Sequence, residues 1–103
     1  MSDGERLKEI VKRLKSGYGA ERVFLFGSAA RGSATRDSDI DLLIISRTQE
    51  RFHQRIGSVL RVARDLSHGL PLAPIVLTPE ELKTRLERGD QFIQQILATG
   101  IEQ

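Results

Sequence analysis

Cysteine and tryptophan are both absent from this 103-residue chain, and none of its apolar runs is long. Without cysteine, the chain has neither a disulfide framework nor a thiolate metal site. None of its apolar runs approaches the roughly 20 residues that a membrane-spanning helix needs. No apolar signal segment is present either, so we expect a cytoplasmic protein with no membrane partner.

Excess charge of one sign is also lacking, and aromatic residues are few. The formal net charge is +2, and aromatic residues make up 5% of the chain. A charge this small does not indicate a nucleic-acid partner, and the arginines between residues 51 and 64 lack the interleaved aromatics of a base-stacking surface. His53 and His68 each lack a second ligand at metal-binding spacing, so we expect no histidine metal site.

The length and composition that remain are those of one globular domain, residues 1–103. Apolar residues make up 39% of the chain and charged residues 29%, which excludes wholesale disorder. The hydrophobic period predicts alternating helices and strands. We expect helices at 4–16, 28–31, between 49 and 67, at 80–88 and at 92–97, and strands at 23–26, 39–45 and 72–77.

This order predicts an α/β (α+β) fold in which helices flank a small mixed β-sheet. The connection between the first two strands is too short for a comfortable parallel crossover, so we expect antiparallel neighbours. Pro74 cannot donate to a sheet ladder, so the third strand is predicted to be an edge strand or to be bulged.

Asp39 and Asp41 stand one residue apart at the start of the most apolar run. On a strand, side chains at i and i+2 point to the same face, so the two carboxylates are expected side by side. Like charges this close disfavour joint ionisation unless a cation lies between them. The pattern therefore predicts a divalent metal site, and Mg²⁺ commonly joins one or two protein carboxylates to phosphate oxygens.

Gly27 and Ser28 end the first strand, and a short helix is expected to follow them. Gly27 lets a ligand approach the backbone, and the N–H groups at the start of a helix attract anions. If the first two strands are neighbours, this corner meets the aspartates and can hold the phosphates of a nucleotide. Arg31 and Arg36 lie on the intervening segment, where they could neutralise a leaving pyrophosphate.

Each half of this pattern also has an ordinary explanation. The aspartates alone could be a solvated strand end, and Gly27 with Ser28 alone could be a simple strand-to-helix turn. The combination of the two at a fixed distance carries the functional interpretation.

Together these residues resemble the minimal nucleotidyltransferases, a branch of the DNA polymerase β superfamily. The resemblance rests on Gly27-Ser28-Ala29-Ala30-Arg31-Gly32 and Ser38-Asp39-Ile40-Asp41-Leu42-Leu43, with ten residues between Gly-Ser and Asp-x-Asp. It implies the nucleotidyltransferase fold. It also implies that Gly27 and Ser28 bind a nucleoside triphosphate, with ATP as the expected substrate, and that Asp39 and Asp41 are catalytic ligands of Mg²⁺. From its position on the intervening segment, Arg31 is expected to join the nucleotide-binding residues. The implied reaction is attack of an acceptor hydroxyl on the α-phosphate with release of pyrophosphate.

One position departs from the family pattern. The third carboxylate of the family lies on the next core strand, and alignment on Val76-Leu77-Thr78-Pro79 puts Ala73 in its place. The sequence therefore leaves three hypotheses open. They are an active transferase, a nucleotide-binding module without turnover, and, because relatives often act beside a helical HEPN protein, an antitoxin that modifies or binds such a partner. A homo-oligomer or hetero-oligomer is expected because so small a chain needs an acceptor site from another subunit.

Overall fold

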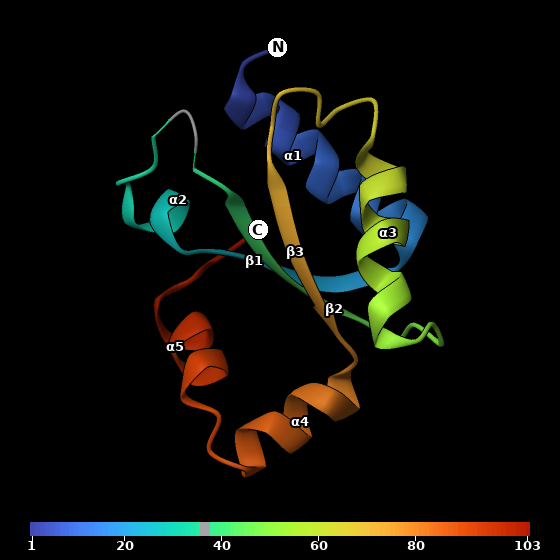
Figure 1. Ribbon diagram of the computed structural model, residues 1–103, viewed down its shortest axis with the longest axis vertical. Coiled ribbons are helices and arrows are strands. Elements are labelled where there is room, and N and C mark those ends of the chain that lie inside the picture. The colour runs from blue at the N-terminus through green and yellow to red at the C-terminus, as the bar shows by residue number, and fades with distance from the viewer. Residues whose placement is uncertain (36–37) are drawn as a thin grey trace.

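The computed structural model describes residues 1–35 and 38–103, and it contains a four-stranded sheet with helices on both faces (Figure 1). The predicted fold class is therefore confirmed. In chain order the elements are α1 (Asp3–Arg13), a π-helical turn (Leu14–Tyr18), β1 (Ala20–Phe26), α2 (Ser28–Arg31), β2 (Ile40–Ser46), α3 (Phe52–Ala63), β3 (Leu72–Leu77), α4 (Pro79–Glu87), α5 (Gln91–Thr99) and β4 (Ile101–Glu102).

The strand order is β3-β2-β1-β4. β1 and β2 pair antiparallel, as their short connection predicted, whereas β3 lies parallel to β2. Pro74 sits on the edge strand β3, as expected of a residue without an N–H group. The two-residue strand β4 covers the other edge of β1 and was not predicted, because so short a segment has no hydrophobic period.

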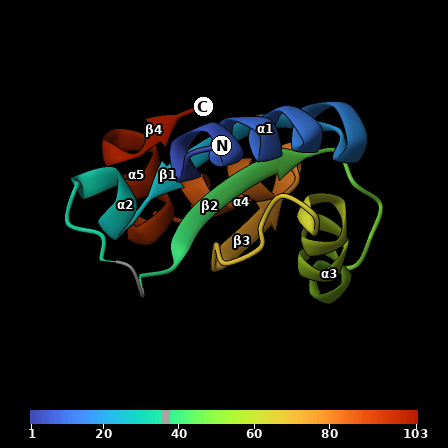
Figure 2. The same cartoon turned by 90° about the horizontal axis from the view of Figure 1, so that it is seen from above.

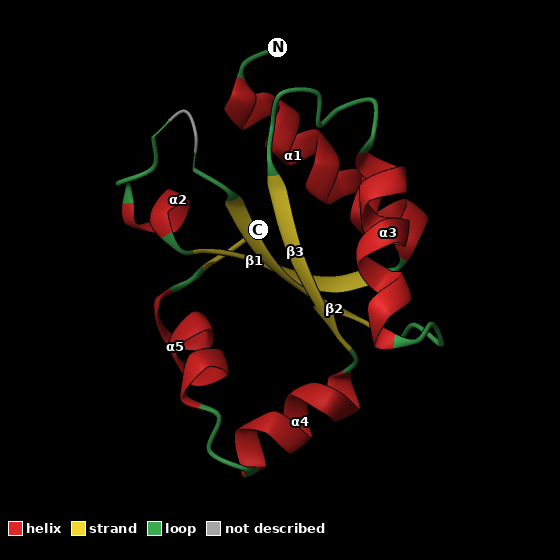
Figure 3. Cartoon of the chain, in the orientation of Figure 1, coloured by secondary structure: helices red, strands yellow, loops and turns green. Residues whose placement is uncertain are grey.

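Apolar residues of the sheet alternate between two cores, and a different pair of helices closes each one. One core joins Leu42 and Ile44 to α1 and α3, and the other joins Leu43 and Ile45 to α5. Figure 3 shows α1 and α3 on one side of the strands and α4 and α5 on the other, and Figure 2 gives the view from above. β2 is apolar on both faces because both faces are covered.

Several helix boundaries differ from the predicted ones for local reasons. The first helix starts at a capping box between Ser2 and Glu5, and its last turn widens into the π-helical segment before Gly19 at φ +83°. α3 (Phe52–Ala63) is shorter at both ends than the helix predicted between residues 49 and 67. In the described parts of the chain, no helix has the length and apolar character to cross a bilayer.

Candidate functional site

The first feature of the site is the meeting of the end of β1 with the start of β2. Because the two strands are antiparallel, Phe26 lies opposite Asp41 in the ladder, and Gly27 follows directly. A Cβ atom built on Gly27 would lie 2.3 Å from Oδ2 of Asp41, and Gly27 has φ +74° and ψ −151°. Glycine is the residue that suits both the backbone conformation and the close carboxylate.

The second feature is α2, a single turn that leads away from this corner. The N–H of Arg31 donates to the carbonyl of Gly27 at 3.2 Å, and Gly32 ends the turn at φ +72°, as predicted. Gly27 is the N-cap of this turn, and no side-chain cap hydrogen bond is made. Ser28 is the first helical residue, which agrees with the helix predicted at 28–31.

A pocket of about 410 Å³ opens from this corner along the face of the sheet covered by α5. Its polar end is formed by Gly27, Arg31 and Asp41, and three of the predicted site residues therefore come together here. Its remaining lining residues are Phe26, Ile75, Phe92, Gln95, Ile96 and Thr99. Sequence reasoning missed the contribution of α5, although Phe92, Gln95 and Thr99 follow each other at helical spacing.

Asp39 occupies a different position from the one predicted. β2 begins at Ile40, so Asp39 lies one residue before the strand and is exposed. It lines a neighbouring hollow of about 460 Å³ together with Thr35 and Ser38 rather than the pocket of Asp41. The two carboxylates nevertheless interact through space, and the negative charge of Asp39 is one of the causes that raise the pKa of Asp41.

Electrostatically, Asp41 is a poorly compensated carboxylate. Partial burial raises its pKa most, the charge of Asp39 raises the pKa further, and Arg31 lowers it. Across residues 1–35 and 38–103, no group donates a hydrogen bond to this carboxylate and none forms an ion pair with it. An ionised group in this state would be stabilised by a cation bound at the polar end of the pocket.

The missing third acid is explained by the register of β3. Ala73 pairs with Asp41 in the parallel ladder, so the two side chains project from the same face of the sheet. A carboxylate at position 73 would therefore stand beside Asp41. Ala73 cannot supply it.

The other acids that follow β3 are held elsewhere. Glu81 lies beyond Leu77, which pairs with Ile45. Ile45 is four residue steps along β2 from Asp41, a distance of about 13 Å. Glu80 pairs with Arg47 at 3.4 Å, and Asp90 accepts a hydrogen bond from the N–H of Ile93 at 3.1 Å. These acids do not replace the missing carboxylate in this structure.

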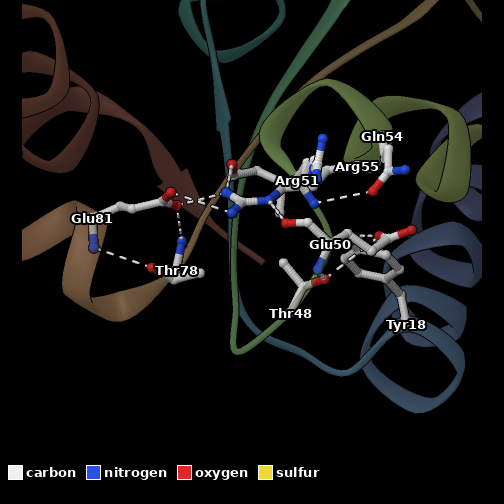
Figure 4. Close-up of polar contacts among 9 residues, drawn as sticks. Tyr18, Thr48, Glu50, Arg51, Gln54, Arg55, Thr78 and Glu81 are labelled. Carbon is white, nitrogen blue, oxygen red and sulfur yellow. Dashed lines mark hydrogen bonds and ion pairs between the residues drawn. The ribbon is translucent and has the colours of Figure 1, made fainter.

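Glu81 belongs to a polar network at the opposite end of the sheet (Figure 4). The buried guanidinium of Arg55 donates to both carboxylate oxygens of Glu81, and also to the carbonyls of Val76 and Glu50 at 3.1 Å. Glu81 in turn accepts from the N–H of Thr78 at 2.8 Å. Arg55 therefore lowers the pKa of Glu81, in contrast to the raised pKa of Asp41.

The donor set at the corner suits one divalent cation that is shared with phosphate oxygens. Asp41 lies in the pocket and Asp39 in the neighbouring hollow, close enough for its charge to act on Asp41, and two carboxylates are the protein contribution typical of a Mg²⁺ site completed by substrate phosphates. The residues that the structure describes contain no group of three acids, histidines or cysteines that would form a site by itself. Arg36, predicted to assist the phosphates, lies outside the described residues.

Comparison with protein families gives a match over nearly the whole chain. A family model described as "Nucleotidyltransferase domain" matches residues 5–98. This range contains the corner of Gly27 and Asp41 and also the pocket lining from α5, apart from Thr99. The match agrees with the resemblance found in the motifs.

Three curated relatives come from Methanocaldococcus jannaschii, and each is provisionally named a protein adenylyltransferase. One is 47% identical over 47 residues, which are 44% of this chain and 47% of the relative. The second is 32% identical over 87 residues, covering 77% and 57%. The third is 28% identical over 102 residues, covering 91% and 95%. The chain thus spans about half the length of the first two relatives and nearly all of the third.

A solved structure supports the fold independently. The crystal structure of a Sulfolobus solfataricus protein, provisionally described as a nucleotidyltransferase, superposes with a TM-score of 0.58 at 31% sequence identity. The superposition covers 78% of this chain and 70% of that chain.

Proposed function

The chain belongs to the nucleotidyltransferase-domain family, and on that premise we propose that it transfers the adenylyl group of ATP to a hydroxyl group on a protein acceptor. The observation that carries this proposal is the packing of Gly27 against the Asp41 carboxylate at the polar end of one pocket. The names of the relatives support adenylyl transfer to protein.

In this proposal the residues of the corner bind different parts of the Mg-ATP complex. Gly27 leaves the backbone open to the phosphates, the first turn of α2 directs N–H groups toward them, and Arg31 offsets negative charge on the departing pyrophosphate. Asp39 and Asp41 would hold Mg²⁺, which when bound supplies charge stabilisation to the reacting phosphate.

The proposed reaction is balanced without a further reactant. The acceptor oxygen forms a bond to the α-phosphorus, the bond from that phosphorus to the β-phosphate oxygen breaks, and pyrophosphate leaves. The hydroxyl proton passes to solvent.

The direct test is label transfer from α-labelled ATP with Mg²⁺, in the presence of candidate acceptor proteins. Asp41→Asn and Asp39→Asn are each expected to reduce transfer by about 100-fold or more, since each removes charge that stabilises the reacting phosphates. Glu87→Gln, an exposed acid at the end of α4, is the matched control and should leave transfer unchanged. Equal transfer by the Asp41 variant and the control would contradict the proposal.

Ala73 supports a second candidate, in which the protein binds Mg-ATP but does not turn it over. Ala73 lies in register with Asp41, where the family pattern has an acid. If this candidate is correct, we expect saturable nucleotide binding that depends on Asp41. No label should be transferred to any acceptor.

A third candidate is an antitoxin that modifies or binds a helical HEPN partner. The exposed stripe of α3, defined as Phe52, Ile56 and Leu60, supports it, because these side chains are 48%, 41% and 39% exposed at four-residue spacing. A stripe of this kind can pack against another helix. Light scattering with the product of the adjacent gene should show a hetero-complex that Ile56→Glu with Leu60→Glu disrupts. A strict monomer in every mixture would exclude both a complex and a homo-oligomer.

A further inference from the structure

Helix α5 presents two adjacent stripes to two different environments. Ile93 and Ile96 are buried in the core on this face of the sheet. Phe92, Gln95 and Thr99 lie along the next stripe and line the pocket that begins at Asp41. The helix therefore forms both a core wall and a pocket wall.

The pocket also has an aromatic part, which runs from Phe26, the neighbour of Gly27, to Phe92 on α5. The rings of Phe26 and Phe92 meet edge to face, with centroids 5.7 Å apart and an interplanar angle of 81°. Phe92 is 52% exposed, so much of its ring is not covered by protein. An exposed aromatic ring in a pocket is a stacking platform for a flat ligand.

We propose that this part of the pocket holds the adenine base of the nucleotide, with the base against Phe92 and its amino edge at Gln95. This inference rests on the proposed function, because it needs the phosphates to be held at Asp41. It adds the residues that would select the nucleoside.

The argument for a base follows from the continuity of the pocket. Gly27, Arg31 and Asp41 form its charged end, and Ile75, Phe92 and Ile96 contribute apolar surface to the same volume. A ligand with phosphates at the charged end carries its nucleoside into the remaining space. The volume of about 410 Å³ lies within the range of roughly 300–1,000 Å³ that is usual for small-molecule sites.

The argument for adenine comes from Gln95. Its side-chain amide has an NH₂ group that can donate to N7 of adenine and an oxygen that can accept from the N6 amino group. In the part of the chain that the structure describes, no hydrogen bond uses this amide. Guanine presents two acceptors on the same edge and would leave the amide oxygen opposite a second acceptor.

The first experiment uses the absence of tryptophan from the chain. Phe92→Trp places the single tryptophan of the variant in the pocket, where it can be excited selectively, and keeps an aromatic platform. Titration with Mg-ATP should quench its emission, and titration with Mg-tripolyphosphate should not, because tripolyphosphate has no base. Equal quenching by both, or none by Mg-ATP at saturating concentrations, would overturn the assignment of the base.

The second experiment measures Mg-ATP, Mg-GTP and Mg-tripolyphosphate affinities by calorimetry. Phe92→Ala should weaken ATP binding by about 5- to 20-fold, which is at the low end for the loss of one stacked base. It should leave tripolyphosphate binding unchanged. Gln95→Ala should weaken ATP by about 5-fold or more and leave GTP unchanged. Gln94→Ala, on the same helix but outside the pocket lining, is the matched control. Thermal melts of each variant confirm that it is folded.

The outcomes separate this inference from the function on which it rests. If Asp41→Asn loses Mg-ATP while Phe92→Ala and Gln95→Ala bind it normally, the proposed function stands and the base pocket is wrong. If Asp41→Asn binds Mg-ATP normally, the proposed function fails. If Phe92→Ala leaves ATP affinity intact but raises KM for a protein acceptor, the pocket belongs to the acceptor and the inference is overturned.

Discussion

Asp41 and Glu81 lie near opposite ends of the same sheet and are held in opposite electrostatic conditions. The Glu81 carboxylate accepts hydrogen bonds from the buried guanidinium of Arg55 and from the N–H of Thr78, and its pKa is lowered. Asp41 is held against Gly27, with Asp39 as a nearby like charge, and its pKa is raised. The first arrangement ties α3 to α4, whereas the second leaves a carboxylate available to an external cation. The difference distinguishes a structural ion pair from a candidate binding site.

The largest expected effect on stability comes from removing the ion pair between Arg55 and Glu81. Arg55→Met should lower the free energy of unfolding by about 2–4 kcal/mol, because Glu81 and the carbonyls of Val76 and Glu50 lose their donor. The value lies at the lower end for buried pairs since the Glu81 side chain is 39% exposed. Urea unfolding measures it.

Arg64→Met is the control for this variant, because Arg64 is an exposed arginine at the C-cap of α3. Its effect should stay within about 0.5 kcal/mol. Similar losses for both arginines would remove the distinction between the network and an ordinary charged surface.

Gly27→Ala should come next, at about 2–3 kcal/mol. Gly27 has a backbone conformation that other residues rarely adopt, and its added methyl group would press on Asp41. Gly32 also has a positive φ, but a Cβ added there would have no atom within 4 Å, so Gly32→Ala should cost only about 1–2 kcal/mol. Replacing Asp41 by Ala in the Gly27→Ala protein should recover part of the loss in a double-mutant cycle. Simple additivity would refute the close contact of Gly27 with Asp41.

Adding a third acid beside Asp41 tests whether Ala73 limits turnover. Ala73→Asp places a carboxylate in register with Asp41, and we expect at least a tenfold rise in Mg²⁺-dependent label transfer. Ala73→Asn has nearly the same size without the charge and serves as the control. If both variants transfer label at equal rates, the residue at position 73 does not limit turnover.

The smallest effect concerns stability without nucleotide. Asp41→Asn should stabilise the nucleotide-free protein at pH 7 by about 0.5–1 kcal/mol, whereas Glu81→Gln should destabilise it. The raised pKa of Asp41 means that its ionised form opposes folding above that pKa, and the gain from Asn disappears as the pH falls below the ordinary value of 3.8.

Glu81 should show the opposite sign in the same pH series. Its lowered pKa contributes stability that is present above 4.5 and lost as the pH falls through the folded-state value. The deficit of Glu81→Gln therefore shrinks on acidification. Unfolding curves at pH 7 and near pH 3.5 would contradict the comparison if both variants shifted in the same direction.

Sequence patterns were sufficient for the parts of the molecule that depend on local chemistry. Gly27 and Asp41 were predicted to meet because a short connection forces antiparallel strands, and the structure confirms that placement. The resemblance to the family put Ala73 in the place of its third acid, and the parallel register shows Ala73 beside Asp41. The roles of these residues in binding and catalysis remain predictions.

The remainder depended on tertiary packing that no local pattern encodes. The position of Asp39 outside β2 follows from where the ladder with β3 begins, and β4 exists because the chain after α5 returns to the free edge of β1. The pocket wall from α5 was missed because Phe92 has the spacing of a core residue. Its 52% exposure is a property of the assembled layers.

The division of α5 into two stripes has an evolutionary consequence. Ile93 and Ile96 anchor the helix in the core, whereas Phe92, Gln95 and Thr99 are exposed. Substitutions at those three outward positions can therefore alter the chemistry of the cleft while the anchor and the acidic corner persist. Related chains built on this scaffold should diverge in ligand preference by changing one face of one helix, at little risk to folding.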